Sequence, residues 1–409
     1  MTFNHAGSGI LIVRSAQPNF AARLSRAGGF SDVFEDRWIA RSGRDATLPN
    51  SLDGDPSGGS VSVASSPFNA LLLSLQWNLH KTATPDAWAI TQGDGSVRVA
   101  IVDTGICTHH ADLAGKVDTE RSVSFVPPAE DPDTLEPVCV GCPDWEDRHG
   151  HGTWVASIVS TNNYGIAGVA PNVRLVAVKV GNHEDRETVS RLIRGIVYAA
   201  DAGSDVISVS RNHGVNPIPD FPRGMALLQR MFAYATRQGA LLVFGAGNDG
   251  IDLDHSGNAI SVPSESTNGM SIGATTISDA LASYSNHGVS GVTMVAPGGG
   301  LPTDPFPETP LNRYVLAACS VHGVNRPCGT TTYDFVEGTS FAAPMVAGAA
   351  ALVISSSPRF KGHPQQVKAQ LVQTADDLGE KGADNLFSKG RLNTLRAVQE
   401  AIRTIVPLR

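Results

Sequence analysis

Six short runs rich in β-branched and other apolar residues recur along the chain, and segments with a helical pattern separate several of them. The runs cover 96–103, 174–180, 205–210, 240–247, 270–276 and 292–298. Such runs, apolar at successive positions, are typical of strands that are buried on both faces of a sheet. Because helical segments such as 187–203 and 225–239 alternate with these strands, we predict an α/β fold. Its sheet is doubly wound and mostly parallel, with helices on both faces.

Length and charge narrow the possible partners. The chain has 409 residues, enough to bury a sizeable core, and a net charge of -8. Nucleic acid is not an expected partner, because phosphate binding needs a dense basic surface. The longest apolar run, 346–355, is rich in Ala and Gly and is shorter than a membrane span. We therefore expect a monomer that binds neither nucleic acid nor a membrane.

The sequence predicts three parts. Residues 1–50 show a strand–helix–strand pattern and would be marginally stable alone, so we expect this unit to dock on the rest of the chain. Residues 51–70 are rich in Ser, Gly and Pro, as in a linker. Residues 71–409 form the main domain. The first residues lack the basic segment of a signal peptide.

Four polar residues stand where the predicted strands and helices begin or end. Asp103 follows a buried strand, and a carboxylate there can hold an imidazole in one tautomer. His151 begins the helical stretch "HGTWVASIVS", and Asn248 lies in a glycine-rich bend after 240–247. Ser340 lies in the first turn of an Ala/Gly-rich helix, where the helix dipole favours negative charge. Taken singly, each is also compatible with a structural turn or cap.

Together, these residues occur in the order Asp, His, Asn, Ser. The segments "VAIVDTGI", "HGTWVAS", "GNDG" and "GTSFAAPMVAGAAAL" closely resemble the catalytic segments of subtilisin-family (subtilase) serine peptidases. The resemblance extends from about residue 75 to residue 405. It implies a subtilisin-like fold and a serine endopeptidase that hydrolyses peptide bonds through an acyl-enzyme.

The resemblance also implies a role for each site residue. Asp103 would orient His151, which would serve as general base and acid for the nucleophile Ser340. Asn248 would line the oxyanion hole. The segment 208–210 would be an edge strand that pairs with the substrate. The predicted substrate-binding residues are Ser210, Arg211, Asn212, Gly247 and Asp249.

The resemblance implies no cofactor for catalysis and no metal ligand among these site residues. Structural calcium is possible, but the loop 160–171 is shorter than the calcium-binding loop of the family, so that site is not carried over. Residues 1–50 resemble the second half of a subtilase propeptide, which implies a zymogen with an intramolecular inhibitor. The expected partner is a polypeptide substrate, and the expected location is outside the cell.

The sequence departs from the family pattern at several positions. Trp154, Phe341 and Met345 stand where the family has His, Met and His, and none of them is a triad position. After "SVS" the family has an apolar residue and two glycines, whereas this chain has "RNHG". We expect these changes to affect packing behind the site and subsite specificity.

Five cysteines leave alternatives open. Cys139 and Cys142, close to His149 and His151, could belong to a zinc site that also uses some of Cys107, His109 and His110. Otherwise they form a disulfide with each other or one that involves Cys107, or they remain thiols. Cys319 and Cys328 flank a turn-rich segment that a disulfide could close, or both are unpaired. Two other functions remain open: a catalytically weak binding protein with the subtilase fold, or a metal-dependent hydrolase that uses the 107–151 loop.

Overall fold

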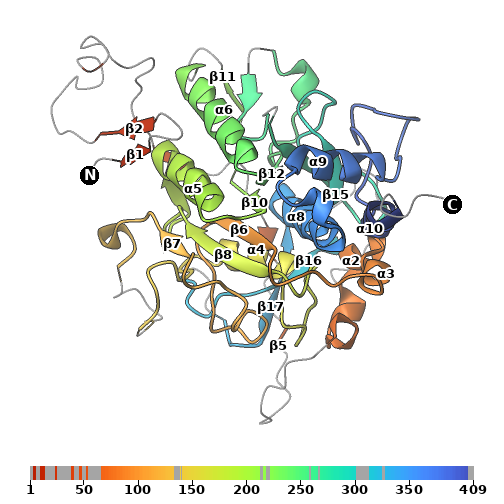
Figure 1. Ribbon diagram of the computed structural model, residues 1–409, viewed down its shortest axis with the longest axis horizontal. Coiled ribbons are helices and arrows are strands. Elements are labelled where there is room, and N and C mark those ends of the chain that lie inside the picture. The colour runs from red at the N-terminus through yellow and green to blue at the C-terminus, as the bar shows by residue number, and fades with distance from the viewer. Residues whose placement is uncertain are drawn as a thin grey trace.

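The computed structural model gives the architecture of the chain (Figure 1). Apart from short pieces within residues 1–53, the described residues are 66–132, 139, 141–211, 215–217, 222–257, 259–265, 268–300, 313–324 and 328–403.

The central element is a sheet of seven strands in the order β15-β14-β12-β10-β6-β8-β7. All neighbouring strands are parallel. Each of the six strands predicted from the sequence is present, and the short β7 is an addition at one edge. The strands are β6 (Arg98–Asp103), β7 (Val123–Ser124), β8 (Arg174–Lys179), β10 (Val206–Val209), β12 (Leu241–Gly245), β14 (Met270–Thr275) and β15 (Met294–Pro297).

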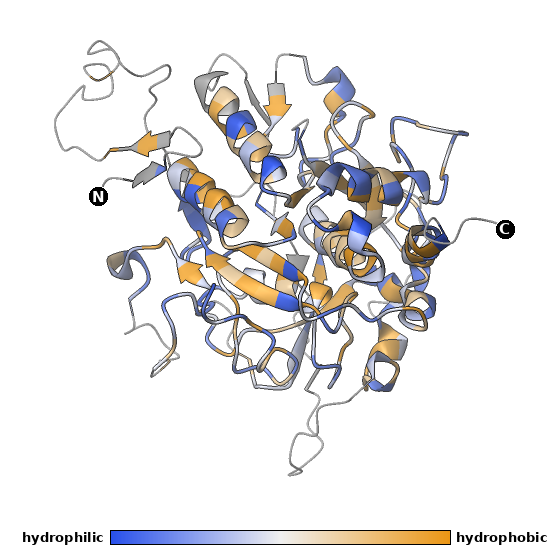
Figure 2. Cartoon of the chain, viewed as in Figure 1, coloured by the Kyte–Doolittle hydropathy of each residue, from blue (hydrophilic) through white to orange (hydrophobic). Residues whose placement is uncertain are grey.

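Helices cover both faces of this sheet. Along β6, Val99 and Ile101 pack into a core that includes α4 and α8, whereas Ala100 and Val102 pack into a second core with α5 and α6. Burial on both sides explains why the strands are apolar at successive positions. Figure 2 shows this pattern as mostly hydrophobic central strands. The α-helices are α2 (Trp77–Lys81), α3 (Thr84–Trp88), α4 (His151–Val159), α5 (Val189–Asp201), α6 (Pro222–Arg237), α8 (Thr339–Ser356), α9 (Pro364–Gln373) and α10 (Thr394–Arg403).

The helix α8 is long and apolar enough to cross a membrane by length and composition, but 89% of it is buried inside the protein. Its small residues let it pack closely: a Cβ added at Gly348 would come within 2.6 Å of Val169 Cβ. This extent of burial is typical of a helix in the core of a protein. The 3-10 helices within the described residues are η1 (Pro67–Asn69), η2 (Leu73–Leu75), η3 (Pro128–Glu130), η5 (Leu253–His255) and η6 (Pro358–Phe360).

Short antiparallel ladders surround the central sheet, and three strands from the first 53 residues join two of them. β4 (Ala46–Thr47) and β5 (Leu52–Asp53) pair with β17 (Thr332–Glu337). β3 (Trp38–Ala40) pairs with β9 (Arg186–Thr188). The other paired strands are β1 (Phe3–His5) with β2 (Ile10–Ile12), β11 (Val215–Pro217) with β13 (Ala259–Ser261), and β16 (Val315–Ala318) with β17.

The strands β2 and β3 fall within the two strands predicted for residues 1–50, and Leu24 in the predicted helix is helical. Most of residues 1–65 lies outside the described residues. The predicted linker contains β5 and η1. The boundaries at residues 50 and 70 therefore stay a prediction.

Candidate active site

The candidate site lies at the carboxyl edge of the central sheet. β6 and β10 are neighbours, but the chain continues from β6 toward β8 on one side and from β10 toward β12 on the other. Such a switch point forms a crevice at the carboxyl ends of parallel strands. Asp103 ends β6, and Ser210 follows β10. The two residues therefore border this crevice.

Asp103 and His151 meet in a direct contact. Nδ1 of His151 lies 2.7 Å from Oδ1 of Asp103, and both side chains are fully buried. His151 begins α4 directly after Gly150, whose φ of 116° is left-handed and costs a glycine little. Gly152 approaches the other loop so closely that an added Cβ would overlap the carbonyl oxygen of Gly105. The glycines thus allow the loops to bring acid and imidazole together.

The electrostatics of this pair define which nitrogen can act as a base. Burial disfavours the ionised form of Asp103, but the charge and hydrogen bond of His151 and the charge of Arg211 outweigh it. Together they hold the pKa of Asp103 below its ordinary value. An ionised carboxylate only accepts hydrogen bonds, so the shared proton lies on Nδ1 of His151. Nε2 then carries the lone pair that a general base needs.

Asp147 holds the loop that leads into His151. Its Oδ1 accepts hydrogen bonds from Thr104 Oγ1 at 2.9 Å, His149 N at 3.0 Å and Gly150 N at 2.8 Å. Its Oδ2 accepts from Thr153 N at 2.9 Å and Thr153 Oγ1 at 2.6 Å. This buried carboxylate therefore connects the end of β6 to the first turn of α4. Sequence reasoning did not single out Asp147, because the partners that reveal its role become neighbours only in the fold.

Ser340 lies in the first turn of α8, 4% exposed. Its Oγ donates to the carbonyl oxygen of Ser210 at 3.4 Å, and Ser210 Oγ donates to the carbonyl oxygen of Ser340 at 2.9 Å. These bonds join the start of α8 to the end of β10. α4 and α8 pack against each other, and the rings of His151 and Phe341 have centroids 5.8 Å apart. Ser340 and His151 therefore lie at the beginnings of two helices in contact.

The orientation of Asn248 follows from its partners. Its Oδ1 accepts hydrogen bonds from Thr339 N at 2.9 Å and Thr339 Oγ1 at 2.8 Å. A backbone N–H can only donate, so the amide oxygen of Asn248 must face Thr339. The amide NH₂ group then points to the other side of the planar amide, where it can donate to a developing negative charge.

The sequence profile of the Subtilase family matches residues 94–390. The chain is 32% identical to thermitase from Thermoactinomyces vulgaris over 336 residues, which are 81% of this chain and 99% of thermitase. It is 31% identical to subtilisin BL from Lederbergia lenta over 328 residues, 80% of this chain and 99% of that protein. The chain belongs to the subtilase family.

This subtilase is a serine-type endopeptidase, as its named relatives are serine proteinases of this family. Solved structures agree on the fold. A lanthipeptide protease has a TM-score of 0.67 at 27% identity and covers 80% of this chain and 97% of its own. The epidermin leader peptide processing serine protease from Staphylococcus aureus has a TM-score of 0.66 at 26% identity, with 81% of each chain covered. The predicted subtilisin-like α/β fold is confirmed.

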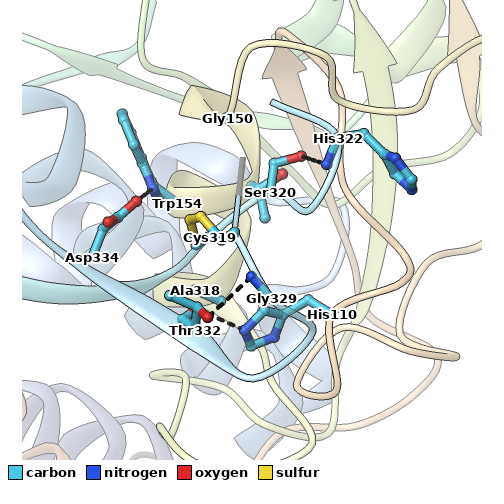
Figure 3. Close-up of a disulfide and its surroundings, with 12 residues drawn as sticks. His110, Gly150, Trp154, Ala318, Cys319, Ser320, His322, Gly329, Thr332 and Asp334 are labelled. Atoms are coloured by element: carbon cyan, nitrogen blue, oxygen red, sulfur yellow. Dashed lines mark hydrogen bonds between the residues drawn. A yellow bond between two sulfur atoms is a disulfide. The ribbon is translucent and has the colours of Figure 1, made fainter. Parts of the chain in front are cut away.

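Of the three departures from the family pattern in this subtilase, Trp154 and Phe341 pack against the ring of His151. The rings of Trp154, His151 and Phe341 pack together, with centroids 6.2 Å apart for Trp154 and His151, 6.3 Å for Trp154 and Phe341, and 5.8 Å for His151 and Phe341. Trp154 Nε1 donates to Oδ2 of Asp334 at 2.8 Å, as Figure 3 shows. Met345 Sδ accepts from Asn78 Nδ2 at 3.3 Å. Trp154 thus supports the imidazole from α4 and Phe341 supports it from α8.

The predicted substrate-binding residues fall in different surroundings. β10 is not an edge strand, because β6 and β12 pair with it on both sides. Ser210 follows the end of that strand and is buried, and its carbonyl oxygen accepts from Ser340 Oγ. Gly247 donates its N–H to Thr339 Oγ1 at 3.1 Å, and Asp249 is exposed beside it. Asn212 lies outside the described residues.

Arg211 points away from solvent. Its side chain is fully buried, and its Nε lies 3.2 Å from Oε2 of Glu187. Its Nη1 contacts Asp185 and lies 3.8 Å from Oδ1 of Asp103. The side chain therefore lies next to Asp103 in the interior of the protein and offers no exposed surface to a substrate. In the sequence, the sign of this buried cation was the departure "RNHG", which places Arg211 directly after a buried strand.

The structure also shows the state of the five cysteines and the contact that His149 makes. Cys139 and Cys142 are paired, as are Cys319 and Cys328, whereas Cys107 is a free, buried thiol. His149 accepts a hydrogen bond from the backbone N–H of His151 through Nδ1, at 3.3 Å. Of the two histidines, it is thus His151 that contacts Asp103.

Proposed function

We propose that Asp103, His151 and Ser340 form the catalytic triad of this endopeptidase and that it cleaves polypeptides through an acyl-enzyme. The observation that carries the proposal is the 2.7 Å contact between buried Asp103 and His151 at the start of α4, the helix that packs on the helix of Ser340. It leaves the lone pair on Nε2 of the imidazole. The roles follow from that placement.

In the first half of the reaction, Ser340 Oγ attacks the carbonyl carbon of the scissile peptide while its proton passes to Nε2 of His151. Asp103 stabilises the imidazolium that forms. The oxygen of the tetrahedral intermediate is stabilised by the amide NH₂ of Asn248 and the backbone N–H of Ser340. His151 then gives the proton to the leaving amine, and an ester with Ser340 remains.

In the second half, water attacks the ester carbonyl and transfers a proton to His151 Nε2. The tetrahedral intermediate collapses, the carboxylic acid leaves, and Ser340 Oγ recovers its proton. Every step uses groups of this chain and water. The substrate is a polypeptide that lies across the end of β10.

A serine variant tests the nucleophile. Ser340→Ala should keep the thermal unfolding temperature close to that of the original chain and lower kcat by about 10⁶, the loss known for such a change in subtilisin. His151→Ala should lose comparable activity, whereas His149→Ala, the matched control, should retain much of it. An active Ser340→Ala enzyme, or a His149→Ala variant as inactive as His151→Ala, would refute the assignment.

We further propose that residues 1–50 act as a propeptide-like inhibitor and that the enzyme works outside the cell. The pairing of β3 with β9 supports the first part, because β9 carries Glu187 of the cluster behind Asp103. The two cysteine pairs agree with an oxidising compartment. If the enzyme removes this segment itself, Ser340→Ala should accumulate with it attached. Identical N-termini in the two proteins would contradict self-processing.

A further inference from the structure

Three loops of the subtilase gather a second set of reactive side chains outside the catalytic residues. His109 lies after β6, Cys139, Cys142 and Glu146 lie before α4, and His322 lies between β16 and β17. Ligand atoms of these five residues all lie within 4.8 Å of one another. Residues so distant in sequence meet only because the loops fold onto one another.

The individual contacts show how close the groups are. Nε2 of His322 lies 3.0 Å from Sγ of Cys139. The rings of His109 and His322 meet edge to face, with centroids 4.9 Å apart. Nδ1 of His109 lies 3.6 Å from Oε1 of Glu146. Cys139 and Glu146 are buried, whereas the side chain of His109 is 49% exposed. The set is thus accessible to an ion from one side.

We propose that this cluster is a zinc site, in which His109, Cys139, Cys142 and His322 bind one Zn²⁺ when the two cysteines are in the dithiol form. Two thiolates and two imidazoles are the donors that zinc prefers, and they favour it over calcium or magnesium. Bond lengths of about 2.0–2.3 Å place neighbouring ligands of a tetrahedral ion about 3.3–3.8 Å apart. Small side-chain rotations bring the cluster to that spacing.

Glu146 supplies the outer contact that such sites usually have. Oε1 of its buried carboxylate lies 3.6 Å from Nδ1 of His109, longer than a hydrogen bond, and has no hydrogen-bond partner. In the zinc form, a small rotation of the His109 ring would close this gap and leave Nε2 of that ring for the metal. A carboxylate that accepts from the second ring nitrogen orients a ligating histidine and increases its basicity. Glu146 therefore acts as a positioning residue for His109.

The loop that carries His322 is held in place. The disulfide between Cys319 and Cys328 closes its base, and Figure 3 shows the His322 ring turned away from that disulfide. Ser320 Oγ donates to the carbonyl oxygen of Asp147 at 2.7 Å, and Val324 N donates to that of Arg148 at 2.8 Å. These bonds connect the His322 loop to the segment that follows the two zinc-binding cysteines.

The disulfide and the zinc ion use the same two sulfur atoms, so they exclude each other. When Cys139 and Cys142 are oxidised, the two thiolates lose two electrons, form one S–S bond and release Zn²⁺. A small disulfide accepts the two electrons and, with two protons, becomes two thiols. We expect the zinc form under reducing conditions and the disulfide form in an oxidising compartment.

The zinc has a structural role in this proposal, which does not rest on the proposed triad. It would tie the segment before Asp147 to two other loops, and Asp147 in turn holds the turn before His151. The experiment uses the full chain with Ser340→Ala, which prevents self-digestion. This protein is reduced with a phosphine, freed of the reagent without oxygen, and titrated with Zn²⁺ against a coloured chelator.

We expect one Zn²⁺ per chain. His322→Ala and Cys142→Ser should lose it, and Glu146→Gln should bind it about 10–100-fold more weakly. His255→Ala is the matched control, because His255 is an 80% exposed histidine paired with Asp252 outside the cluster. Co²⁺ in the reduced chain should give the visible bands of a tetrahedral ion and thiolate charge-transfer bands.

Several results would overturn the proposal. One is a reduced, folded chain that binds no Zn²⁺ or whose Co²⁺ complex lacks thiolate bands. Another is zinc affinity in His109→Ala and His322→Ala equal to that of His255→Ala. A third is a Cys139–Cys142 disulfide that cannot be reduced while circular dichroism still shows the native fold. Because reduction also frees Cys319 and Cys328, which lie beside Asp334, the thiolate bands count for this cluster only if Cys142→Ser, still folded by circular dichroism, loses them.

Discussion

The Arg211 guanidinium lies 3.8 Å from Oδ1 of Asp103, the same oxygen that contacts Nδ1 of His151. It also contacts Asp185 and Glu187, so one buried cation is shared by three carboxylates. Burial disfavours the charge of Arg211, but the three acids outweigh burial and raise its pKa. Arg211 is therefore a permanent cation next to the contact between Asp103 and His151.

Replacing this cation should alter how the enzyme depends on pH. In Arg211→Met, Asp103 loses one of the charges that favour its ionised form, so its pKa should rise. Protonated Asp103 cannot stabilise the imidazolium of His151. The acidic limb of the kcat profile should therefore move to higher pH. Folding stability should fall by about 3–5 kcal/mol, because buried carboxylates are left uncompensated.

A compensated variant separates charge from packing. The triple change Arg211→Met, Glu187→Gln, Asp185→Asn removes two of the acids with the cation, so it should recover much of the lost stability and part of the original pH profile. Kinetics from acidic to neutral pH and chemical unfolding provide both readouts. An unchanged acidic limb in Arg211→Met would mean that the guanidinium does not act on Asp103.

Glu187 makes stability depend on pH in a defined direction. Its pKa is raised to about 7, because burial disfavours its ionised form more than Arg211 favours it, and Asp185 and Asp103 add to the rise. In the unfolded chain a glutamate ionises near pH 4.3. Between about pH 4.3 and 7 the unfolded chain thus binds fewer protons, and the contribution of Glu187 to stability falls as pH rises.

Glu187→Gln removes this titration. The unfolding free energy of the variant minus that of the original chain should increase, by on the order of 3 kcal/mol, between pH 4 and pH 8. Denaturant unfolding in the Ser340→Ala background measures it without self-digestion. Glu184→Gln, an exposed neighbour, should show no comparable trend. A pH-independent difference for Glu187→Gln would contradict the raised pKa.

The sequence was sufficient for the central sheet and, through its family segments, for the assignment to the subtilases, whereas the roles of the site residues stay predictions. Strands such as β6 are apolar on both faces, so their pattern stands out from that of loops. Asp103, His151, Asn248 and Ser340 were identifiable because each lies in a short segment with a family pattern. Their local surroundings also decide their chemistry, as with the carboxylate at the end of a parallel strand.

Other features depend on neighbours that are distant in the chain. Arg211 was expected to bind substrate, but its partners Asp185 and Glu187 lie 24 or more positions earlier and become visible only in the fold. The segment 208–210 was predicted to be an edge strand. The sequence of a single strand does not reveal which strands lie next to it in the sheet. The spacing of Cys139 and Cys142 indicated zinc as one alternative, but it did not point to His322, which is 183 positions from Cys139.

Asn248 should act on the rate of the chemical step. Asn248→Ala should lower kcat by about 10²–10³, the effect known for the corresponding asparagine of subtilisin, with little change in KM. Because Oδ1 of Asn248 also anchors Thr339, the alanine variant alone does not isolate the NH₂ group. Asn248→Asp keeps an oxygen for Thr339 and removes the donor. Equal losses in both variants would assign the effect to the donor, and near-normal kcat in Asn248→Asp would refute it.

Asp147 should be the carboxylate on which the His151 loop depends. Its two oxygens accept five hydrogen bonds, all from N–H or O–H donors. In Asp147→Asn one oxygen becomes an NH₂ group that faces donors, so two or three of these bonds are lost and donors are left unsatisfied. We expect a stability loss of about 1–3 kcal/mol and a lower kcat, because Gly150 and the first turn of α4 are no longer held.

Asp144→Asn, at an exposed position in the same segment, is the matched control and should change neither quantity. Thermal unfolding and steady-state kinetics of the two variants check this. An Asp147→Asn enzyme as stable and as active as Asp144→Asn would show that the loop is held by its other contacts.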